Sequence, residues 1–284
     1  MNRLIFGCGY LGSRVAKRWL ESGDNVYSIT RDRSRAEEIK SLGFLPIIAD
    51  ITEPDTLVGL PKAETVLFAV GMDRTRYDDI RLVYVDGLQH VLDKIGNELA
   101  HFIYVSSTGV YGDFGGQWID EHSPTEPARE GGKACLEAEH LIAASDLSAR
   151  ATILRFAGIY GPGRVPTRQL IESKQWKKLS AVGYLNLIHV DDGARIIEQV
   201  SNQPPSGETF IVSDGQPPLR RDYYEFIANH FGLSEIPWGQ SETRSENSRS
   251  GSSKRVSNQK LVDRFHAEFA FSDYKAGLSH AFDA

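Results

Sequence analysis

The chain has 284 residues, 40% hydrophobic and 25% charged, with a formal net charge of −6. This length suits one large α/β domain or a domain with a smaller lobe, and the apolar fraction is sufficient to build a core. No apolar run approaches the ~18 residues of a membrane-spanning helix, and the stretch before Gly7 is too short for a secretory signal. Cys8 and Cys135 lie far apart, which argues against a disulfide scaffold or a structural zinc site. The acidic balance argues against nucleic acid as a partner. We therefore expect a soluble, cytoplasmic protein that binds neither nucleic acid nor membrane.

Strands and helices alternate along the first part of the chain. Short apolar runs predict buried strands over residues 3–6, 25–30, 45–49, 65–70, 101–107 and 151–156. Apolar residues at helical spacing predict helices over residues 10–22, 35–42, 78–99 and 129–145, and a helical turn over 55–60. Gly23 suits the C-terminal cap of the first helix. This alternation predicts a parallel sheet covered by helices on both faces.

The pattern becomes less regular after residue 160. Pro162 and Pro166 interrupt it, and we expect further helices over residues 167–174, 192–199 and 221–230. Strands are expected over residues 185–190 and 208–212. The polar, serine-rich stretch 239–253 predicts a long loop, which is either a lid over a substrate or an insertion without function.

A glycine-rich turn follows the first predicted strand. The segment Gly7-Cys8-Gly9-Tyr10-Leu11-Gly12 fits G-x-G-x-x-G and opens the first predicted helix. In that context Gly7 permits the tight turn, Gly9 lets a pyrophosphate approach the backbone, and Gly12 allows close packing of helix on strand. The N–H groups at the start of the helix would face the phosphate. The alternative is a glycine turn that serves the fold alone.

The end of the second predicted strand bears on the cofactor. A residue about 20 positions after the glycine turn reads the 2′ position of a bound dinucleotide. Arg31, in Thr30-Arg31-Asp32-Arg33-Ser34-Arg35, lies 19 residues after Gly12 and can hold a 2′-phosphate through its guanidinium fork, which favours NADP over NAD. Asp32 leaves NAD open, because a shift of one residue would make it the acceptor for a ribose hydroxyl. These arginines are otherwise an ordinary solvated loop.

Six further segments follow in order along the chain. They are Asp50-Ile51-Thr52, Phe68-Ala69-Val70-Gly71, Tyr84-Val85-Asp86-Gly87, Val105-Ser106-Ser107-Thr108-Gly109-Val110-Tyr111-Gly112, Leu154-Arg155-Phe156-Ala157-Gly158-Ile159-Tyr160-Gly161-Pro162-Gly163, and Ile188-His189-Val190-Asp191-Asp192. Together with the glycine turn and a closing Tyr274-Lys275-Ala276-Gly277-Leu278, they resemble the motifs of extended short-chain dehydrogenases/reductases of the NAD(P)-dependent epimerase/dehydratase type. The resemblance spans nearly the whole chain.

The resemblance implies a doubly wound parallel sheet, a Rossmann fold, with a smaller C-terminal α/β substrate lobe. The NAD(P)-binding domain would comprise residues 1–160 with a return segment near 187–202, and the substrate lobe residues 161–186 and 203–284. The resemblance implies that the cofactor is bound by Gly7, Gly9, Tyr10, Leu11, Gly12, Thr30, Arg31, Asp50, Ile51, Ala69, Val70, Gly71, Val105, Lys133 and Phe156. Arginines in or near the substrate segments, Arg164, Arg168, Arg220 and Arg221, could bind an anionic diphosphate.

The catalytic motif of that family is incomplete in this sequence. Lys133 matches the family lysine, which holds the nicotinamide ribose, and Ser107 matches the serine that positions the substrate oxygen. Four residues before Lys133, where the family has its acid/base tyrosine, the residue is Arg129, which cannot shuttle a proton near neutral pH. No tyrosine occurs between Tyr111 and Tyr160. Because the family places the tyrosine of the 105–112 segment beside the substrate, the resemblance makes Tyr111 the best candidate for the proton transfer, ahead of Glu130 and a water relay.

Two functions remain open. The first is an NAD(P)-dependent oxidoreductase or epimerase-like enzyme, which moves a hydride on a nucleotide-sugar or related carbonyl or polyol. The second is a non-catalytic NADP-binding sensor or interaction protein. The same residues also have ordinary structural interpretations: Ser107 as a strand end, Tyr111 as a core aromatic and Lys133 as a solvated charge. We expect no metal, because His189 is better explained as a cap of the following helix, and Asp120-Glu121 as a loop feature. Homodimerisation through the helices at 78–99 and 129–145 is common in the family and stays open.

Overall fold

The computed structural model describes residues 1–96, 99–166, 181–204, 207–233, 236, 238 and 253–284. In it the chain folds into two compact units. The first comprises Met1–Val110, Arg129–Arg155 and Gly193–Phe210, and the second comprises Tyr111–Ala128, Phe156–Asp192 and Ile211–Ala284. Each unit is described by itself below.

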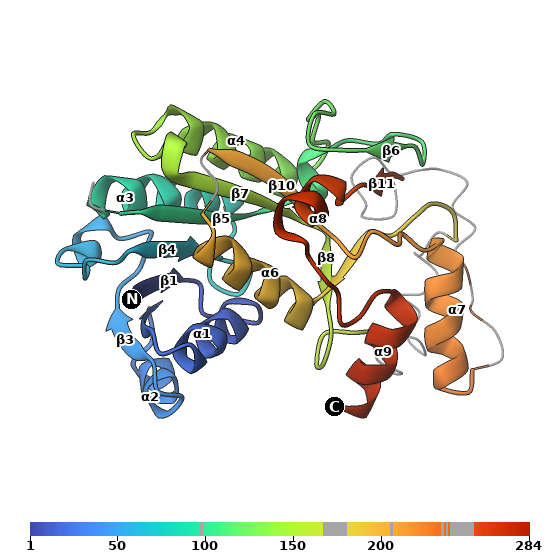
Figure 1. Cartoon of the computed structure of the whole chain (residues 1–284), viewed down its shortest axis with the longest axis horizontal. Coiled ribbons are helices and arrows are strands. Elements are labelled where there is room, and N and C mark those ends of the chain that lie inside the picture. The colour runs from blue at the N-terminus through green and yellow to red at the C-terminus, as the bar shows by residue number, and fades with distance from the viewer. Residues whose placement is uncertain (97–98, 167–180, 205–206, 234–235, 237, 239–252) are drawn as a thin grey trace. The chain divides into compact units, whose positions relative to one another are not determined.

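A seven-stranded sheet organises the first unit (Figure 1). Its strand order is β10-β7-β5-β4-β1-β2-β3. The strands are β1 (Asn2–Phe6), β2 (Asn25–Thr30), β3 (Leu45–Ile48), β4 (Thr65–Phe68), β5 (His101–Ser107), β7 (Ala151–Phe156) and β10 (Glu208–Val212). The pairs β1–β2, β1–β4, β2–β3 and β4–β5 are all parallel. An order that starts in the middle and grows outward in both directions is that of a doubly wound α/β fold.

Helices lie on both faces of this sheet (Figure 1). They are α1 (Gly12–Glu21), α2 (Arg33–Ser41), α3 (Gly87–Lys94), α4 (Glu130–Ala144) and α6 (Val190–Asn202), with short helical turns η1 (Pro54–Leu57), η2 (Leu82–Asp86), η3 (Thr108–Val110) and η4 (Ser148–Arg150). The N–H of Gly23, whose φ is +83°, donates to Leu20 just after α1, as the sequence predicts for a cap. The expected parallel α/β sandwich is thus confirmed.

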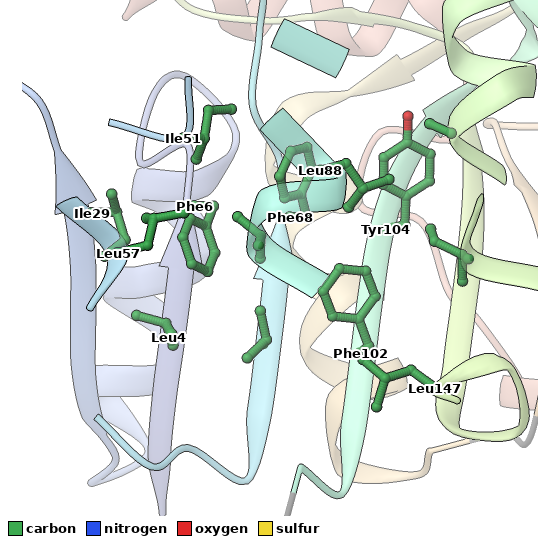
Figure 2. Packing of buried hydrophobic residues seen from close by; sticks show 14 of the residues in the cluster. Leu4, Phe6, Ile29, Ile51, Leu57, Phe68, Leu88, Phe102, Tyr104 and Leu147 are labelled. Carbon is green, nitrogen blue, oxygen red and sulfur yellow. The ribbon is translucent and has the colours of Figure 1, made fainter. Parts of the chain in front are cut away.

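The core of this unit contains a row of aromatic residues in register on neighbouring strands (Figure 2). Phe6 of β1 pairs with Phe68 of β4, and Phe68 pairs with Tyr104 of β5. Their ring centres are 6.1 and 5.9 Å apart along the row, and each residue is at most 2% exposed. Burial of side chains of this size contributes roughly 1.5–3 kcal/mol each relative to exposure. This row therefore fixes the register of the strands whose carboxyl ends carry the candidate site.

One predicted helix is substantially shorter than expected. The pattern over residues 78–99 predicts a single long helix, whereas the structure has the π-helical turn η2 followed by α3, which ends at Lys94. Ile95 is extended, with φ −75° and ψ 129°, and Gly96 follows it. Leu99 is buried in the hydrophobic core instead of continuing the helix. The apolar pattern continues beyond the end of α3 because Leu99, which follows the helix, is also buried in the core.

The second unit contains shorter elements. They are β6 (Trp118–Ile119), β8 (Gly158–Tyr160), β9 (Leu187–His189), α7 (Arg220–His230), β11 (Arg255–Val256), α8 (Gln259–Phe265) and α9 (Tyr274–Asp283). The pairs β8–β9 and β6–β11 are parallel. The helix expected over 167–174 and nearly all of the loop expected over 239–253 lie outside the described residues, as does Arg168. No helix in the part of the chain that the structure describes is long and apolar enough to cross a bilayer.

Candidate cofactor and active site

In the glycine turn between β1 and α1, the packing of the chain requires glycine at positions 7 and 12 but not at position 9. A Cβ on Gly7, whose φ is +90°, would lie 2.4 Å from the carbonyl oxygen of Ala69, and a Cβ on Gly12 would lie 2.3 Å from that of Gly7. A Cβ on Gly9 would meet nothing within 4 Å. Leu11, the N-cap of α1, makes no side-chain capping bond. The turn therefore leaves an open cradle at the start of a helix, which fits a pyrophosphate.

The helix begins two residues later than the sequence predicts, so Tyr10 belongs to the turn and not to α1. The guanidinium carbon of Arg14 lies 4.4 Å from the centre of the Tyr10 ring, and Arg14 also donates to the carbonyl of Tyr10 at 2.8 Å. These contacts hold the outer edge of the turn in place.

The end of β2 distinguishes the two candidates for reading the 2′ position. β2 ends at Thr30, and Arg31 is the first residue after it. Asp32 is the N-cap of α2, and its Oδ1 accepts the N–H of Ser34 at 2.7 Å and the Ser34 hydroxyl at 2.9 Å. These hydrogen bonds lower the pKa of Asp32. The carboxylate of Asp32 is thus used in capping a helix, whereas Arg31 points to a different set of partners.

Those partners include Asp50, which follows β3 and is 6% exposed. Its Oδ1 accepts the N–H and the hydroxyl of Thr52 at 2.9 and 2.8 Å, and its Oδ2 accepts the hydroxyl of Tyr77 at 2.8 Å. Burial raises the pKa of Asp50, but the hydrogen bonds from Thr52 and Tyr77 and the charge of Arg31 outweigh it and leave the pKa below its usual value. Asp50 is therefore a fixed anion beside Arg31. The sequence does not single out Tyr77, because it lies outside the motifs that resemble the family.

The segments after β3 and β4 are held against the core. Ile51 is 8% exposed, and a Cβ on Gly87 would come within 2.7 Å of its side chain, which explains a glycine at the start of α3. Ala69 donates its N–H to Phe6 at 2.8 Å, directly beside the glycine turn. Val70 packs on the hydrophobic core, and Gly71 is exposed. Three of the predicted cofactor residues, Ala69, Val70 and Gly71, thus lie at the carboxyl end of β4, next to β1.

The catalytic candidates of the first unit meet at the end of β5. Ser107 is its last residue, and its Oγ accepts the N–H of Gly109 at 3.0 Å. A Cβ on Gly109 would lie 3.9 Å from the Cα of Gly132 in the first turn of α4. That turn carries Lys133, whose Nζ lies 2.8 Å from Oε1 of Glu130 and whose side chain is 55% exposed. The fold thus brings the Ser107 turn against the turn that carries Lys133, and Val105 lies half-buried on the same strand.

Arg129 immediately precedes α4 as its N-cap. Its backbone is extended, with φ −109° and ψ 148°, and its carbonyl accepts the N–H of Lys133 at 3.0 Å. The residue at the position that the resemblance assigns to tyrosine is therefore one helical turn from Lys133.

Tyr111 and Phe156 belong to the second unit. Tyr111 is 2% exposed, and Phe156, the last residue of β7, is 3% exposed. The carbonyls of Tyr111 and Gly112 each accept a hydrogen bond from Nζ of Lys254 at 3.2 Å, and Lys254 is itself 8% exposed. A buried ammonium group thus fixes the backbone of the segment that carries Tyr111.

A buried polar network joins β5, α4 and β7 in the first unit. The carboxylate of Glu139 accepts the hydroxyl of Ser106 at 2.6 Å, and the guanidinium of Arg155 at 2.7 and 3.0 Å. The side chains of Arg155 and Glu139 are 10% and 5% exposed. Such a fork-to-fork pair has strong directional hydrogen bonds, so it ties α4 to the strand that carries Ser107. The sequence motifs contain Ser106 and Arg155, and the predicted helix over 129–145 contains Glu139, but no pattern in the sequence indicates that these three side chains bond to one another.

His189 lies in the second unit within a small group of possible metal ligands. One ligand atom each from His189, Asp191 and His280 lies within 4.8 Å of the others. Nδ1 of His189 accepts the N–H of Asp191 at 3.3 Å, and its Nε2 faces Nδ1 of His280 at 3.4 Å. The two ring nitrogens of His189 therefore have partners on opposite sides of the ring. The contact to Asp191 is a cap of α6, as predicted for His189.

Two acidic residues of this unit have structural partners. The helix expected from Asp192 begins earlier, at Val190, and the Asp192 carboxylate accepts the N–H groups of Ala270 and Phe271 at 2.9 and 3.0 Å. Glu121 accepts the N–H of Ile211 at 2.7 Å, which agrees with a loop feature and not with an acid/base pair. Arg220, considered above for a diphosphate, is 4% exposed and donates to the carbonyl of Val182 at 3.3 Å.

The fold and the glycine turn together define a dinucleotide-binding class of α/β protein. The sequence model of the NAD dependent epimerase/dehydratase family matches residues 4–213, and this chain belongs to that family. The resemblance deduced from the motifs is thereby confirmed.

Individual relatives cover almost the full length of the chain. A protein from Methylobacillus flagellatus, described as a candidate NAD-dependent epimerase/dehydratase, is 32% identical, with 99% of this chain and 97% of that chain covered and a TM-score of 0.78. Protein YeeZ of Escherichia coli strain K12 is 24% identical over 95% of this chain and 96% of its own length. The Bordetella bronchiseptica enzyme WbmG, solved in complex with NAD and UDP, shares the fold with a TM-score of 0.77 at 18% identity, with 99% of this chain and 93% of that chain covered.

Proposed function

We propose that this protein is an NAD(P)-dependent oxidoreductase or epimerase-type enzyme that acts by hydride transfer on a nucleotide-sugar or a related carbonyl or polyol. The observation that carries the proposal is the glycine turn. The space beside Gly9 is open, while Gly7 and Gly12 are closed in by the chain. Only a ligand that approaches the backbone needs a glycine at the open position. The NAD and UDP bound to WbmG support the classes of cofactor and substrate.

NADP is the favoured cofactor in this proposal. Thr30, and not an acidic residue, ends β2, so the strand offers no carboxylate to a ribose 2′-hydroxyl at that position. Arg31 follows, and Asp32 is used in capping α2. A guanidinium at this place suits a 2′-phosphate, because it offers two parallel N–H donors to two phosphate oxygens.

The chain's own residues would divide the chemistry as follows. When bound, the nicotinamide ring gives or takes a hydride at C4. Lys133 holds the nicotinamide ribose through its ammonium group. The Oγ of Ser107 accepts the N–H of Gly109, and in this proposal its own O–H donates to a substrate oxygen. Tyr111 exchanges the proton, because Arg129 occupies the position that the resemblance assigns to the acid/base tyrosine.

A non-catalytic NADP-binding protein is the second candidate. One observation favours it: the ammonium group of Lys133 is paired with Glu130 at 2.8 Å, and the residue one turn earlier is an arginine. A lysine whose charge is matched by a carboxylate contributes less to lowering the pKa of a nearby phenol. This candidate retains cofactor binding and lacks turnover.

Two measurements test the proposal. Fluorescence titration with NADPH and NADH should show tighter binding of NADPH, and Arg31→Ala should abolish that preference. Arg33→Ala, which removes the same charge two residues away, should leave the preference intact. Tight NADH binding that Arg31→Ala does not change would refute the cofactor assignment.

Turnover separates the two candidate functions. NADPH oxidation is followed by absorbance with a panel of carbonyls and nucleotide-sugars. The enzyme proposal expects activity that Tyr111→Phe and Lys133→Ala each reduce at least a hundredfold. Activity that survives both substitutions would contradict the assigned roles, and binding without any turnover would favour the sensor.

A further inference from the structure

A short turn after β4 contacts Arg31 and Asp50, which are both predicted to bind the cofactor. Arg31 would hold the 2′-phosphate, and the resemblance implies that Asp50 contacts the adenine. We define this 73–77 turn as Asp73 to Tyr77. The Nη2 of Arg31 lies 3.1 Å from Oδ2 of Asp73, and the guanidinium carbon lies 5.2 Å from the centre of the Tyr77 ring. The hydroxyl of Tyr77 donates to Oδ2 of Asp50 at 2.8 Å. The turn is thus bonded to Arg31 through one end and to Asp50 through the other.

The 73–77 turn is held in shape by its own hydrogen bonds. Oδ1 of Asp73 accepts the N–H of Thr75 at 3.1 Å and the Thr75 hydroxyl at 2.6 Å. The carbonyl of Asp73 accepts the N–H of Tyr77 at 3.0 Å. One carboxylate oxygen therefore builds the turn, and the other is presented to Arg31. The pairing with Arg31 does not depend on a freely rotating side chain.

The contacts of the 73–77 turn have the same chemistry as those of a 2′-phosphorylated adenosine. The Oδ2 of Asp73 accepts from the guanidinium as an oxygen of a phosphate would. The Tyr77 ring gives the guanidinium an aromatic face, as an adenine ring would. The phenolic O–H donates to Asp50, as an exocyclic amino group would. Phosphate, ring and donor thus each have a counterpart within five residues of this chain.

We propose that the 73–77 turn competes with the adenosine 2′-phosphate end of the cofactor for Arg31 and Asp50, so that Asp73 sets how strongly NADP is preferred over NAD. This inference rests on the proposed function. The 2′-phosphate must exchange places with the Asp73 carboxylate on Arg31 or bind beside it against its charge. NAD carries no phosphate there, so its binding does not depend on Asp73.

A second cation belongs to the same cluster. The Nη2 of Arg76 lies 3.7 Å from Oδ2 of Asp50, and its guanidinium carbon lies 5.8 Å from the centre of the Tyr77 ring. The cluster therefore holds two guanidinium groups and the carboxylates of Asp50 and Asp73, which balance. Neutralising Asp73 leaves it with a net positive charge, and a phosphate is then attracted more strongly.

The test compares dissociation constants of NADPH and NADH for the wild-type chain, Asp73→Asn, Tyr77→Phe and Asp78→Asn. Asparagine retains an oxygen that can accept from Thr75. Asp78→Asn removes the same charge from a nearby exposed residue and is the matched control. Asp73→Asn should tighten NADPH binding about two- to fivefold, the range that a partly exposed ion pair supports, and leave NADH binding unchanged. Tyr77→Phe, which loses the bond to Asp50, should tighten the binding of both cofactors by a similar factor.

The possible results separate the two proposals. The competition is overturned, while the proposed function stands, if Asp73→Asn binds NADPH no more tightly than Asp78→Asn does. Weaker binding by Asp73→Asn would make Asp73 a residue that positions Arg31 for the phosphate. Failure of the wild-type chain and all three variants to bind either cofactor overturns the proposed function, and the competition with it. Binding of NADPH by Asp73→Asn alone supports the competition.

Discussion

The buried pair between Glu139 and Arg155 gives the sharpest stability prediction. Arg155→Met removes the guanidinium and leaves the Glu139 carboxylate, which is 5% exposed, with only the hydroxyl of Ser106 as its described side-chain donor. Removing one partner of a buried pair costs about 3–5 kcal/mol, because the remaining charge stays desolvated. A domain of this size has a free energy of unfolding of about 5–15 kcal/mol. The variant should therefore lose a large fraction of its stability.

The measurement is urea unfolding, followed by tryptophan fluorescence and circular dichroism. The midpoint should fall while the slope stays constant, which would show that the native state has lost stability and not compactness. Arg81→Met is the matched control, because Arg81 also holds a glutamate of α4, Glu137, through its guanidinium. Those two side chains are 54% and 44% exposed, so the midpoint should not move measurably.

A double variant tests the cause. Arg155→Met combined with Glu139→Leu removes both charges and should recover much of the lost stability, since well-packed apolar pairs replace buried ion pairs at little cost. Recovery stays incomplete, because the hydroxyl of Ser106 then loses its acceptor. A loss below about 1 kcal/mol in Arg155→Met, or a double variant less stable than the single one, would refute the reasoning from burial.

Three further predictions follow from the geometry and pKa values. Gly9→Ala should leave the melting temperature unchanged and weaken dinucleotide binding at least tenfold, as thermal melts and cofactor titrations would show. Gly7→Ala should lower the free energy of unfolding by about 1–3 kcal/mol, because Gly7 has a positive φ and its added Cβ would clash with Ala69. Burial and neighbouring carboxylates raise the pKa of Asp214 to about 7, so this carboxyl makes the folded chain progressively less stable as pH rises from about 4 to 7. Asp214→Asn removes that loss, and its stabilising effect on the free energy of unfolding should be roughly 2–3 kcal/mol larger at pH 8 than at pH 5. Equal effects in urea at both pH values would contradict this prediction. Burial and the charge of Arg3 lower the pKa of His101 to about 4, so the stability it contributes is present above about pH 6.5 and lost as pH falls to 4; His101→Gln should flatten that acid limb in urea titrations.

The sheet could be predicted because parallel strands buried on both faces are short apolar runs. All seven strands of the central sheet correspond to predicted ones, and four of them have the predicted bounds: Asn25–Thr30, His101–Ser107, Ala151–Phe156 and Glu208–Val212. A parallel sheet also predicts that the carboxyl ends of these strands share one edge. The residues after β2, β3 and β4 and at the end of β5 meet there for that reason.

The partners of those residues could not be predicted in the same way. Tyr77 and Asp73 lie in a connection without helical or strand periodicity, so no pattern links them to Arg31. The pairing of Glu139 with Arg155 depends on which face of α4 packs on β5 and β7, which helical spacing leaves open. Hydrophobic periodicity reports which residues are buried, but not which buried polar groups find one another.

In the basic segment after β2, the partners found in the structure change the prediction of what binds a phosphate. Read from sequence, Arg31-Asp32-Arg33-Ser34-Arg35 is a cluster of three cations around one anion, and a phosphate is its natural partner. In the structure Asp32 caps α2, and Arg35 pairs with Glu38 and donates to the carbonyl of Cys8. The charge of Arg31 acts on Asp50, and Arg31 is already paired with Asp73. In the competition proposed above, the affinity for a 2′-phosphate depends on two anions that compete for one guanidinium, and not on the number of arginines in the segment.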